Sequence, residues 1–202
     1  MKYAKTLPEG SEEKKRELLS NGWNTLKEPD SIRKMILYSI PFMIINIAIT
    51  ILMINIVSPF TLEEFGIMES GVEITLNFFH LLGLILMTSI HELMHLVFVP
   101  NFIRSDKTYI GLTLFEGFVH TEEKVKRNRF ILISLAPFVI LSIILPLVLV
   151  PLGLLTTSLK VYMILNAAGA SVDVLNILLI YPQVPSKALI TNNGIKSYWK
   201  EC

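Results

Sequence analysis

Four apolar stretches, separated by polar segments, dominate the pattern of hydrophobic and polar positions in this chain. They cover residues 35–57, 74–100, 131–152 and 161–181. Each has close to the roughly 20 apolar residues that a helix needs to cross the hydrocarbon core of a bilayer. The pattern therefore predicts an all-α membrane protein with about four transmembrane helices.

The polar segments have weaker patterns of their own. A short helix is predicted at 12–19, within the charged N-terminal segment 1–34. In the loop 101–130, residues 108–115 are rich in β-formers, Glu116 and Gly117 favour a turn, and 118–121 can return as a strand. The C-terminal tail 182–202 contains a weaker hairpin pattern, 188–190 and 195–199 around a turn at 192–194. We therefore expect a four-helix domain at 35–181 that includes a short β-rich loop.

Composition and charge support this reading and orient the helices. The chain is 52% hydrophobic, which is too apolar for a soluble domain of this size, and a net charge of +1 gives no reason to expect nucleic acid. Lys and Arg number 8, 0, 6, 1 and 3 in the segments 1–34, 58–73, 101–130, 153–160 and 182–202. Basic segments stay in the cytoplasm. The sequence thus predicts a multi-pass protein of the cell membrane, with the lipid bilayer as a partner and both termini cytoplasmic.

Candidate chemistry lies inside the second apolar stretch. Residues 91–95 read His-Glu-Leu-Met-His, the H-E-x-x-H pattern of zinc peptidases. Residues four apart share one face of a helix, so His91 and His95 can both reach one metal ion. Glu92 can accept a proton from water that the metal activates. The alternative is a pair of membrane histidines with satisfied hydrogen bonds, but an ionisable residue within a membrane is by default functional.

A catalytic zinc site needs a third protein ligand. Apart from Glu92, the only carboxylate in the four apolar stretches is Asp173. Both His91 and Asp173 lie roughly 12–14 Å from the predicted cytoplasmic ends of their helices, at 1.5 Å per residue. Depth therefore favours Asp173 as the third ligand, with a structural aspartate as the alternative.

The other polar residues of these stretches are given weaker functional assignments. Asn166 lies on the face of Asp173 and is either a residue that holds the substrate or an interhelical hydrogen-bonding residue. Asn176, one turn beyond Asp173, is a candidate to support the ligands. His80 is too far along its helix to be a ligand. No role is assigned to His120 or to the two prolines of the third stretch, at 137 and 146, since membrane helices tolerate proline.

The motif at 91–95, with Asn166 and Asp173 on a later helix, resembles the site-2 proteases, which are intramembrane zinc metalloproteases. The chain is more closely similar to small bacterial membrane proteins described as zincin peptidases. In these the histidine motif is followed by a β-rich loop, a Leu-Ala-Pro helix start (135–137 here) and a late Asn-to-Asp helix. The resemblance spans about 74–190. It implies a membrane-anchored protein as substrate, cut near the cytoplasmic side.

One departure from the site-2 proteases concerns the third-ligand helix. Those proteins have Asn-Pro, further prolines and Asp-Gly there, whereas this chain has Asn166-Ala167 and Asp173-Val174 with no proline between. A broken helix is therefore not expected from the sequence.

Together the residues and the resemblance predict a zinc-dependent intramembrane endopeptidase. Zn²⁺ is held by His91, His95 and Asp173, and Glu92 acts as general base and then as proton donor. A strand at 108–115 is expected to offer an edge to which unwound substrate can add. The alternative is a non-proteolytic zinc-binding membrane protein that binds or chaperones membrane helices. A transporter is disfavoured, because four helices without repeat symmetry are poorly suited to alternating access.

Overall fold

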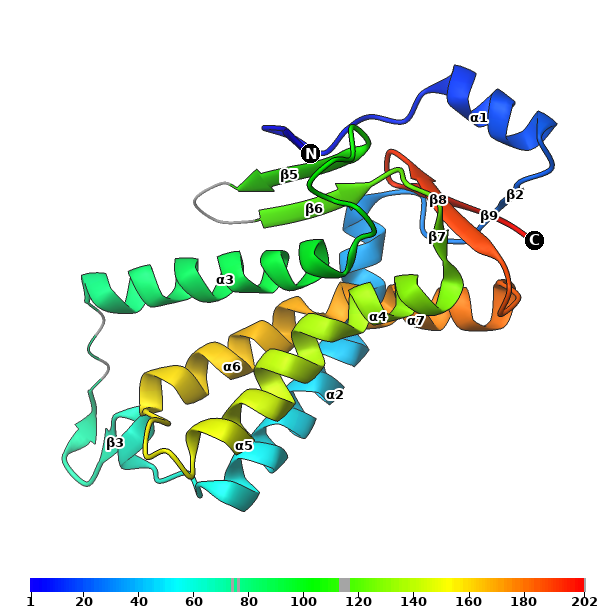
Figure 1. The fold of residues 1–202 in the computed structure, drawn as a ribbon. Helices are drawn as coiled ribbons and strands as arrows, with labels where there is room; N and C mark the ends of the chain where they lie inside the picture. Colours follow the sequence, from blue (N-terminus) through cyan, green and yellow to red (C-terminus); the bar gives the residue numbers. More distant parts are fainter. Residues whose placement is uncertain (74, 76, 113–116, 202) are drawn as a thin grey trace.

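The computed structural model describes residues 1–73, 75, 77–112 and 117–201. Within these residues, four helical segments are long and apolar enough to cross a membrane: Ile32–Val57, Phe78–Phe98, Arg127–Leu149 and Thr157–Gln183. The first two are the helices α2 and α3 (Figure 1). The four predicted stretches are thus confirmed as helices of spanning length. Each differs from its predicted bounds by a few residues, and positions 74 and 76 lie outside the described residues.

The third segment is a composite helix. It consists of α4 (Arg127–Pro137), a π-helix η2 (Phe138–Ile144) and α5 (Leu145–Leu149). The Leu-Ala-Pro sequence at 135–137, which resembles a helix start in similar proteins, instead ends α4 in the middle of the segment. At the first residue of α4, the Arg127 guanidinium donates to the Tyr181 carbonyl at 3.1 Å and lies over the Tyr181 ring.

The fourth segment is interrupted although it lacks the expected prolines. α6 (Thr157–Gly169) and α7 (Ser171–Gln183) meet at Ala170, whose ψ angle of 1° leaves the helical range. The expectation of an unbroken helix was therefore wrong. The break lies in the run of small residues at 167–171, which also packs on α2: the Asn46 amide donates to the Ala167 carbonyl at 3.2 Å. Small side chains permit such close approach of backbones.

The protein is mostly helical, but the prediction of an all-α protein omits the three sheets found among the described residues. One has the order β1-β5-β6, formed by Lys2–Tyr3, Thr108–Leu112 and Gly117–Thr121. Another has the order β2-β9-β8-β7, formed by Asn24–Thr25, Lys196–Lys200, Leu189–Asn193 and Val125–Lys126. A small sheet joins β3 (Ile67–Met68) and β4 (Gly71–Val72). The N-terminal segment, the loop 101–130 and the tail therefore share sheets, which short-range patterns do not reveal.

The locally predicted elements are present within these assemblies. The short helix is α1 (Glu12–Ser20), and the tail hairpin is β8–β9. The predicted hairpin of the loop is β5–β6, whose register pairs Thr108 with Thr121 and Ile110 with Val119. Of the predicted turn, Gly117 is instead the first residue of β6, and Glu116 lies outside the described residues, as do residues 113–115 of the first strand.

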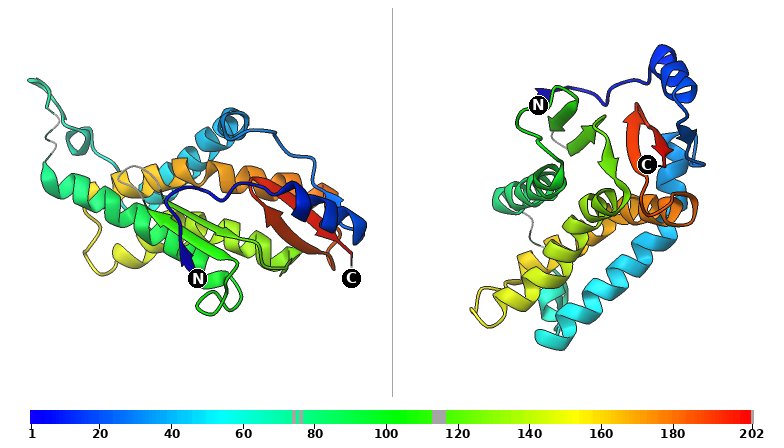
Figure 2. Two further views of the ribbon diagram at one scale, coloured as in Figure 1. Left: turned by 90° about the horizontal axis from the view of Figure 1, so that it is seen from above. Right: turned by 45° about the vertical axis from the view of Figure 1, so that its right-hand side comes forward.

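The two ends of the molecule are different in character. Both termini and the two larger sheets lie at one end of the helices, and β3–β4 lies at the other (Figures 1 and 2). At the β3–β4 end, a 3-10 turn η1 (Glu63–Phe65) carries Glu64, which accepts from Lys160 Nζ at 2.9 Å. Lys160 is 1% exposed. A buried charge without a partner is strongly unfavourable, so this ion pair holds the loop against α6.

Candidate metal centre

The two histidines of the motif lie one turn apart on α3 and face a carboxylate from α7. Asp173 Oδ2 is 3.5 Å from Nε2 of His91 and 3.5 Å from Nε2 of His95. One ligand atom from each of the three residues lies within 4.8 Å of the other two. The structure thus brings together the three predicted ligands from two segments of the chain.

The interruption at Ala170 places the carboxylate. Asp173 is in the first turn of α7, just after the break. The break lets α7 take its own direction after α6, while Asn166, before the break, remains on α6. The two residues that the sequence places on one helical face therefore come from two helices, and they contact different atoms of the site.

Each histidine is oriented by a hydrogen bond at its other ring nitrogen. His91 Nδ1 is 2.8 Å from the Asn166 side-chain oxygen, and His95 Nδ1 is 2.8 Å from the Ile133 carbonyl. Both partners are acceptors, so both Nδ1 atoms carry a proton, and the Nε2 atoms are the ring nitrogens that remain to bind a metal. Such outer partners fix the tautomer and the ring direction of a metal-binding histidine.

Pro137 accounts for the availability of the Ile133 carbonyl. In an α-helix this carbonyl accepts from the N–H four residues later, and residue 137 is a proline without an N–H. The carbonyl is therefore left without its helical donor and accepts from His95. Pro137, to which no role was assigned from the sequence, therefore bears on the orientation of His95.

Asn166 is fully committed to protein contacts at its amide nitrogen. It donates to the Pro137 carbonyl at 3.2 Å and to Ser142 Oγ at 2.8 Å, while its oxygen accepts from His91. The asparagine therefore positions His91 and ties α6 to the π-helix. Its N–H groups are not free to donate to a substrate carbonyl in this arrangement. Ser142, which the sequence did not single out, is itself fully buried.

Glu92 lies near β6, whereas His95 contacts α4 through the Ile133 carbonyl. Its carboxylate accepts a hydrogen bond from the backbone N–H of Val119 in β6. Glu92 and His91 line a cavity of about 320 Å³, whose wall also contains Gly117, Asn166 and Gly169. A Cβ placed on Gly169 would meet nothing within 4 Å, which is consistent with open space at this point. The general base predicted from the sequence thus has room for water and a peptide beside it.

The arrangement fits zinc on the chemistry of its donors. In a tetrahedral zinc site with bonds of about 2.0–2.2 Å, two ligand atoms are about 3.3–3.6 Å apart, which the two histidine–aspartate distances match. Two imidazole nitrogens and one carboxylate oxygen are a typical catalytic set. The side chains are 11–19% exposed, so a fourth position can be reached.

The remaining predicted or unassigned residues lie around this centre. Asn176 lines a second cavity that contains His95 and Asp173. His120, to which no role was assigned, lines the same cavity. His80 is distant from the centre: it caps the start of α3, where its Nδ1 accepts from Asn77 N–H at 3.3 Å. The sequence does not show that the Ile133 carbonyl is a hydrogen-bond acceptor for a histidine. The proline four residues later does indicate that this carbonyl lacks its helical donor.

We expect Pro137→Ala to weaken zinc binding by up to about 10-fold. Removing the hydrogen-bond partner of a metal-binding histidine lowers metal affinity by about 10- to 100-fold, and this substitution keeps the partner of His95 but adds a second donor to it. The new N–H at residue 137 competes with His95 for the Ile133 carbonyl. Competition titration with a chelator measures the affinity. Pro41→Ala, in α2, is the matched control and should leave it unchanged. Equal affinities for all three proteins would contradict this account.

Residues 84–189, about half of the chain, match a protein-family model described as "Putative zincin peptidase". The matched range contains every residue of the metal centre described above. No curated protein and no solved structure matches the chain.

Proposed function

Because the chain belongs to this zincin peptidase family, we propose that it is a zinc-dependent endopeptidase that cuts membrane-anchored proteins within the bilayer, near its cytoplasmic face. The observation that carries the proposal is the convergence of His91, His95 and Asp173 on helices of spanning length. A metal-hydrolase centre in such helices is within reach of a substrate that is itself in the membrane.

When bound, zinc acidifies a water molecule and polarises the carbonyl of the scissile peptide. The Glu92 carboxylate accepts the proton of the attacking water and then delivers it to the nitrogen of the leaving amine. The Val119 N–H holds that carboxylate in place. Asn166 and the Ile133 carbonyl keep the two imidazole rings aimed at the same point.

β6 is the strand that supports an extended substrate. The strand predicted for this role, 108–115, was the wrong one: its described part, β5, lies between β1 and β6. β6 is an edge strand of the sheet, and its residues line both cavities beside the metal centre. Gly117 lines the cavity of Glu92, and Val119 and Thr121 line the cavity of Asp173. A peptide added to β6 would therefore pass the metal from one cavity to the other.

Substrate cleavage is tested in cells that carry either the intact protein or Glu92→Gln. Quantitative proteomics of the membrane fraction should show single-span proteins that are shortened only with the intact protein. The same set of full-length proteins in both cells would reject the endopeptidase. It would favour the non-proteolytic zinc-binding protein, which needs the ligands but not Glu92.

The proposed orientation is tested by cysteine labelling in a Cys202→Ser background. A cysteine at Glu69, an exposed residue of the β3–β4 loop, should react with an impermeant maleimide added to intact cells. Glu64 is unsuitable because it neutralises the buried Lys160. A cysteine at Lys124 should react only after permeabilisation, because basic segments resist translocation. The reverse pattern would put both termini outside.

A further inference from the structure

A second cavity, of about 280 Å³, adjoins the metal centre on the side of the two larger sheets. His95, Asp173 and Asn176 form part of its wall. Much of the remaining wall is apolar and comes from the helices, including Val99, Phe130, Ile133 and Ile180. A cavity with an apolar wall and a few polar groups is typical of a ligand site. Whatever occupies it lies directly beside the two predicted ligands.

The N-terminal segment, residues 1–14, reaches this cavity from outside the helices. Leu7 is part of the cavity wall. Before Leu7, β1 pairs in parallel with β5, and the Ala4 N–H donates to the Ile110 carbonyl at 3.0 Å. Figure 2 shows the segment passing from β5 towards α1, across the end of the molecule that carries the sheets. The segment thus runs over the cavity from one sheet towards the other.

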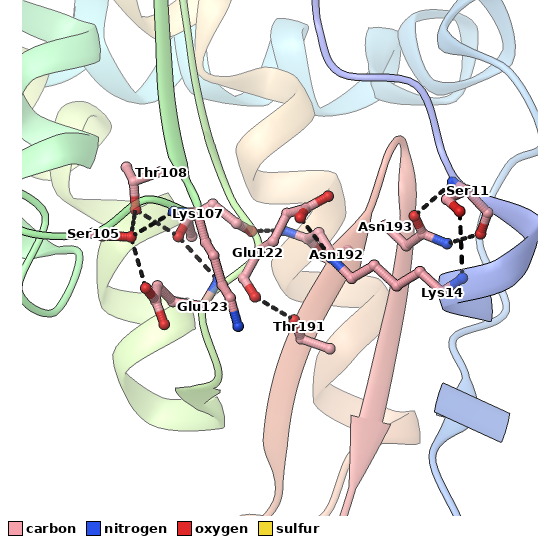
Figure 3. Close-up of polar contacts among 11 residues, drawn as sticks. Ser11, Lys14, Ser105, Lys107, Thr108, Glu122, Glu123, Thr191, Asn192 and Asn193 are labelled. Carbon is pink, nitrogen blue, oxygen red and sulfur yellow. Dashed lines mark hydrogen bonds and ion pairs between the residues drawn. The ribbon is translucent and has the colours of Figure 1, made fainter. Parts of the chain in front are cut away.

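A second anchor holds the segment on the far side of Leu7. Ser11 N–H donates to Asn193 Oδ1 at 2.9 Å, and Asn193 Nδ2 donates back to the Ser11 carbonyl at 2.8 Å. Lys14 Nζ lies 2.6 Å from a Glu122 oxygen and donates to the Asn192 carbonyl at 3.1 Å. Figure 3 shows these contacts between the segment, the β8–β9 hairpin and the end of β6.

The contact between the segment and the hairpin tip is close. A Cβ on Gly194 would lie 2.4 Å from the Gly10 nitrogen, and Gly194 has a φ of +58°. Only glycine permits both the approach and the backbone conformation without strain. The tip of the hairpin, which also lines the cavity at Asn192 and Gly194, is therefore shaped to receive the segment.

The closed arrangement leaves one polar atom without a partner. His120, in the wall of the same cavity, is 7% exposed, and within the described part of the chain its Nε2 has no hydrogen bond. Burial lowers the pKa of His120, Lys14 lowers it further and Glu122 opposes the shift. A buried polar atom without a partner is unfavourable. Displacing one wall of the cavity would let water or a peptide group reach it.

We propose that this cavity receives the substrate segment on the cytoplasmic side of the cleaved bond, and that residues 1–14 are a detachable cover that leaves before the segment can pass. The identity of the occupant rests on the proposed endopeptidase function. The occupant is an extended and mainly apolar peptide, because the cavity continues from β6 and its wall is mostly apolar.

The anchors are of a kind that can open. Lys14 and Glu122 have side chains that are 27% and 17% exposed, and the contacts with Asn192 and Asn193 are part-buried hydrogen bonds. Segments held by few apolar contacts and by solvated polar ones open locally at small free-energy cost. The segment also lies outside residues 84–189, so the cover is not part of the region that the family model matches.

The cover is tested without any substrate. Ser134, in the cavity wall and 6% exposed, is replaced by cysteine in a Cys202→Ser background. Inside-out vesicles are then treated with a charged, impermeant methanethiosulfonate. Lys14→Glu, which repels Glu122, should raise the labelling rate about 10-fold, the effect of losing one charge-assisted hydrogen bond. Lys15→Glu is the matched control, because the salt bridge of Lys15 is to Glu12 of its own helix.

A second pair of variants guards against misfolding. Asn193→Ala removes the contact with Ser11 and should also speed labelling, whereas a disulfide made by Ser11→Cys with Asn193→Cys should slow it until reductant is added. Zinc content is measured in each variant. Labelling that is equally fast in the parent protein and in both opened variants would overturn the cover.

Cleavage separates the two parts of the proposal. With a substrate found by the proteomic comparison, Lys14→Glu should be cut several-fold faster and the disulfide form slower. Faster labelling without faster cleavage would overturn the cavity as the path of the substrate. No cleavage by any variant, including the parent, would reject the endopeptidase instead, while the labelling result would still decide the cover.

Discussion

Glu92→Gln should keep its zinc and lose cleavage by about 100- to 10,000-fold, the usual contribution of a general base. Glutamine preserves the shape of the side chain and can still accept from the Val119 N–H. It has no basicity, so it cannot take the proton of the attacking water. The ligands His91, His95 and Asp173 are untouched. Metal content by emission spectroscopy and cleavage of a substrate identified by proteomics measure the two effects on purified protein.

Glu69→Gln is the control for this experiment, because Glu69 is exposed at the opposite end of the molecule. It should retain both zinc and activity. Cleavage by Glu92→Gln at the rate of the parent would remove Glu92 from the mechanism. Loss of zinc in Glu92→Gln would show that the Glu92 carboxylate is needed to bind the metal, so its effect on activity could not be assigned to proton transfer.

Asp173→Ala should lose both zinc and activity. It removes one of the three protein ligands, and two histidines on one helix do not make a complete site. It also removes the only carboxylate within 4 Å of both histidine Nε2 atoms among the described residues. We expect zinc affinity to fall by more than the roughly 10- to 100-fold that loss of an outer partner costs. Chelator competition and metal analysis provide the measurement.

Asn176→Ala, one turn further along α7, is the control and should keep its zinc, since Asn176 lines the neighbouring cavity. Full zinc occupancy in Asp173→Ala would require another ligand. His120 would then be the first residue to replace, because it lines the same cavity as His95.

Local sequence patterns were sufficient to predict a feature when all the residues that determine it lie in one segment of the chain. Long apolar runs predict the four helices because a helix satisfies its own backbone hydrogen bonds, whatever its neighbours are. The two histidines meet because residues four apart share a helical face. Asp173 could be selected because carboxylates are rare in apolar stretches and must have a reason to be there.

Contacts between distant segments could not be read in the same way. The partner of His95 is a backbone carbonyl, freed by a proline whose effect depends on which helix lies opposite. The break at Ala170 has no proline, and Gly169 just before it is only a weak signal, because isolated glycines are also tolerated inside helices. β5 is not an edge strand, because β1, from the N-terminal segment, pairs with it on the side opposite β6. Among the described strands, this leaves β6 with a free edge.

The sequence by itself determined the number of long helices, the metal motif and a short set of candidates for the third ligand, because each depends on spacing along one element. Only the tertiary structure decided which atoms form the candidate metal site, which strand lies beside Glu92 and which distant segments line the second cavity. These depend on how segments far apart in the chain pack, and many different sequences can share the same local pattern while packing differently.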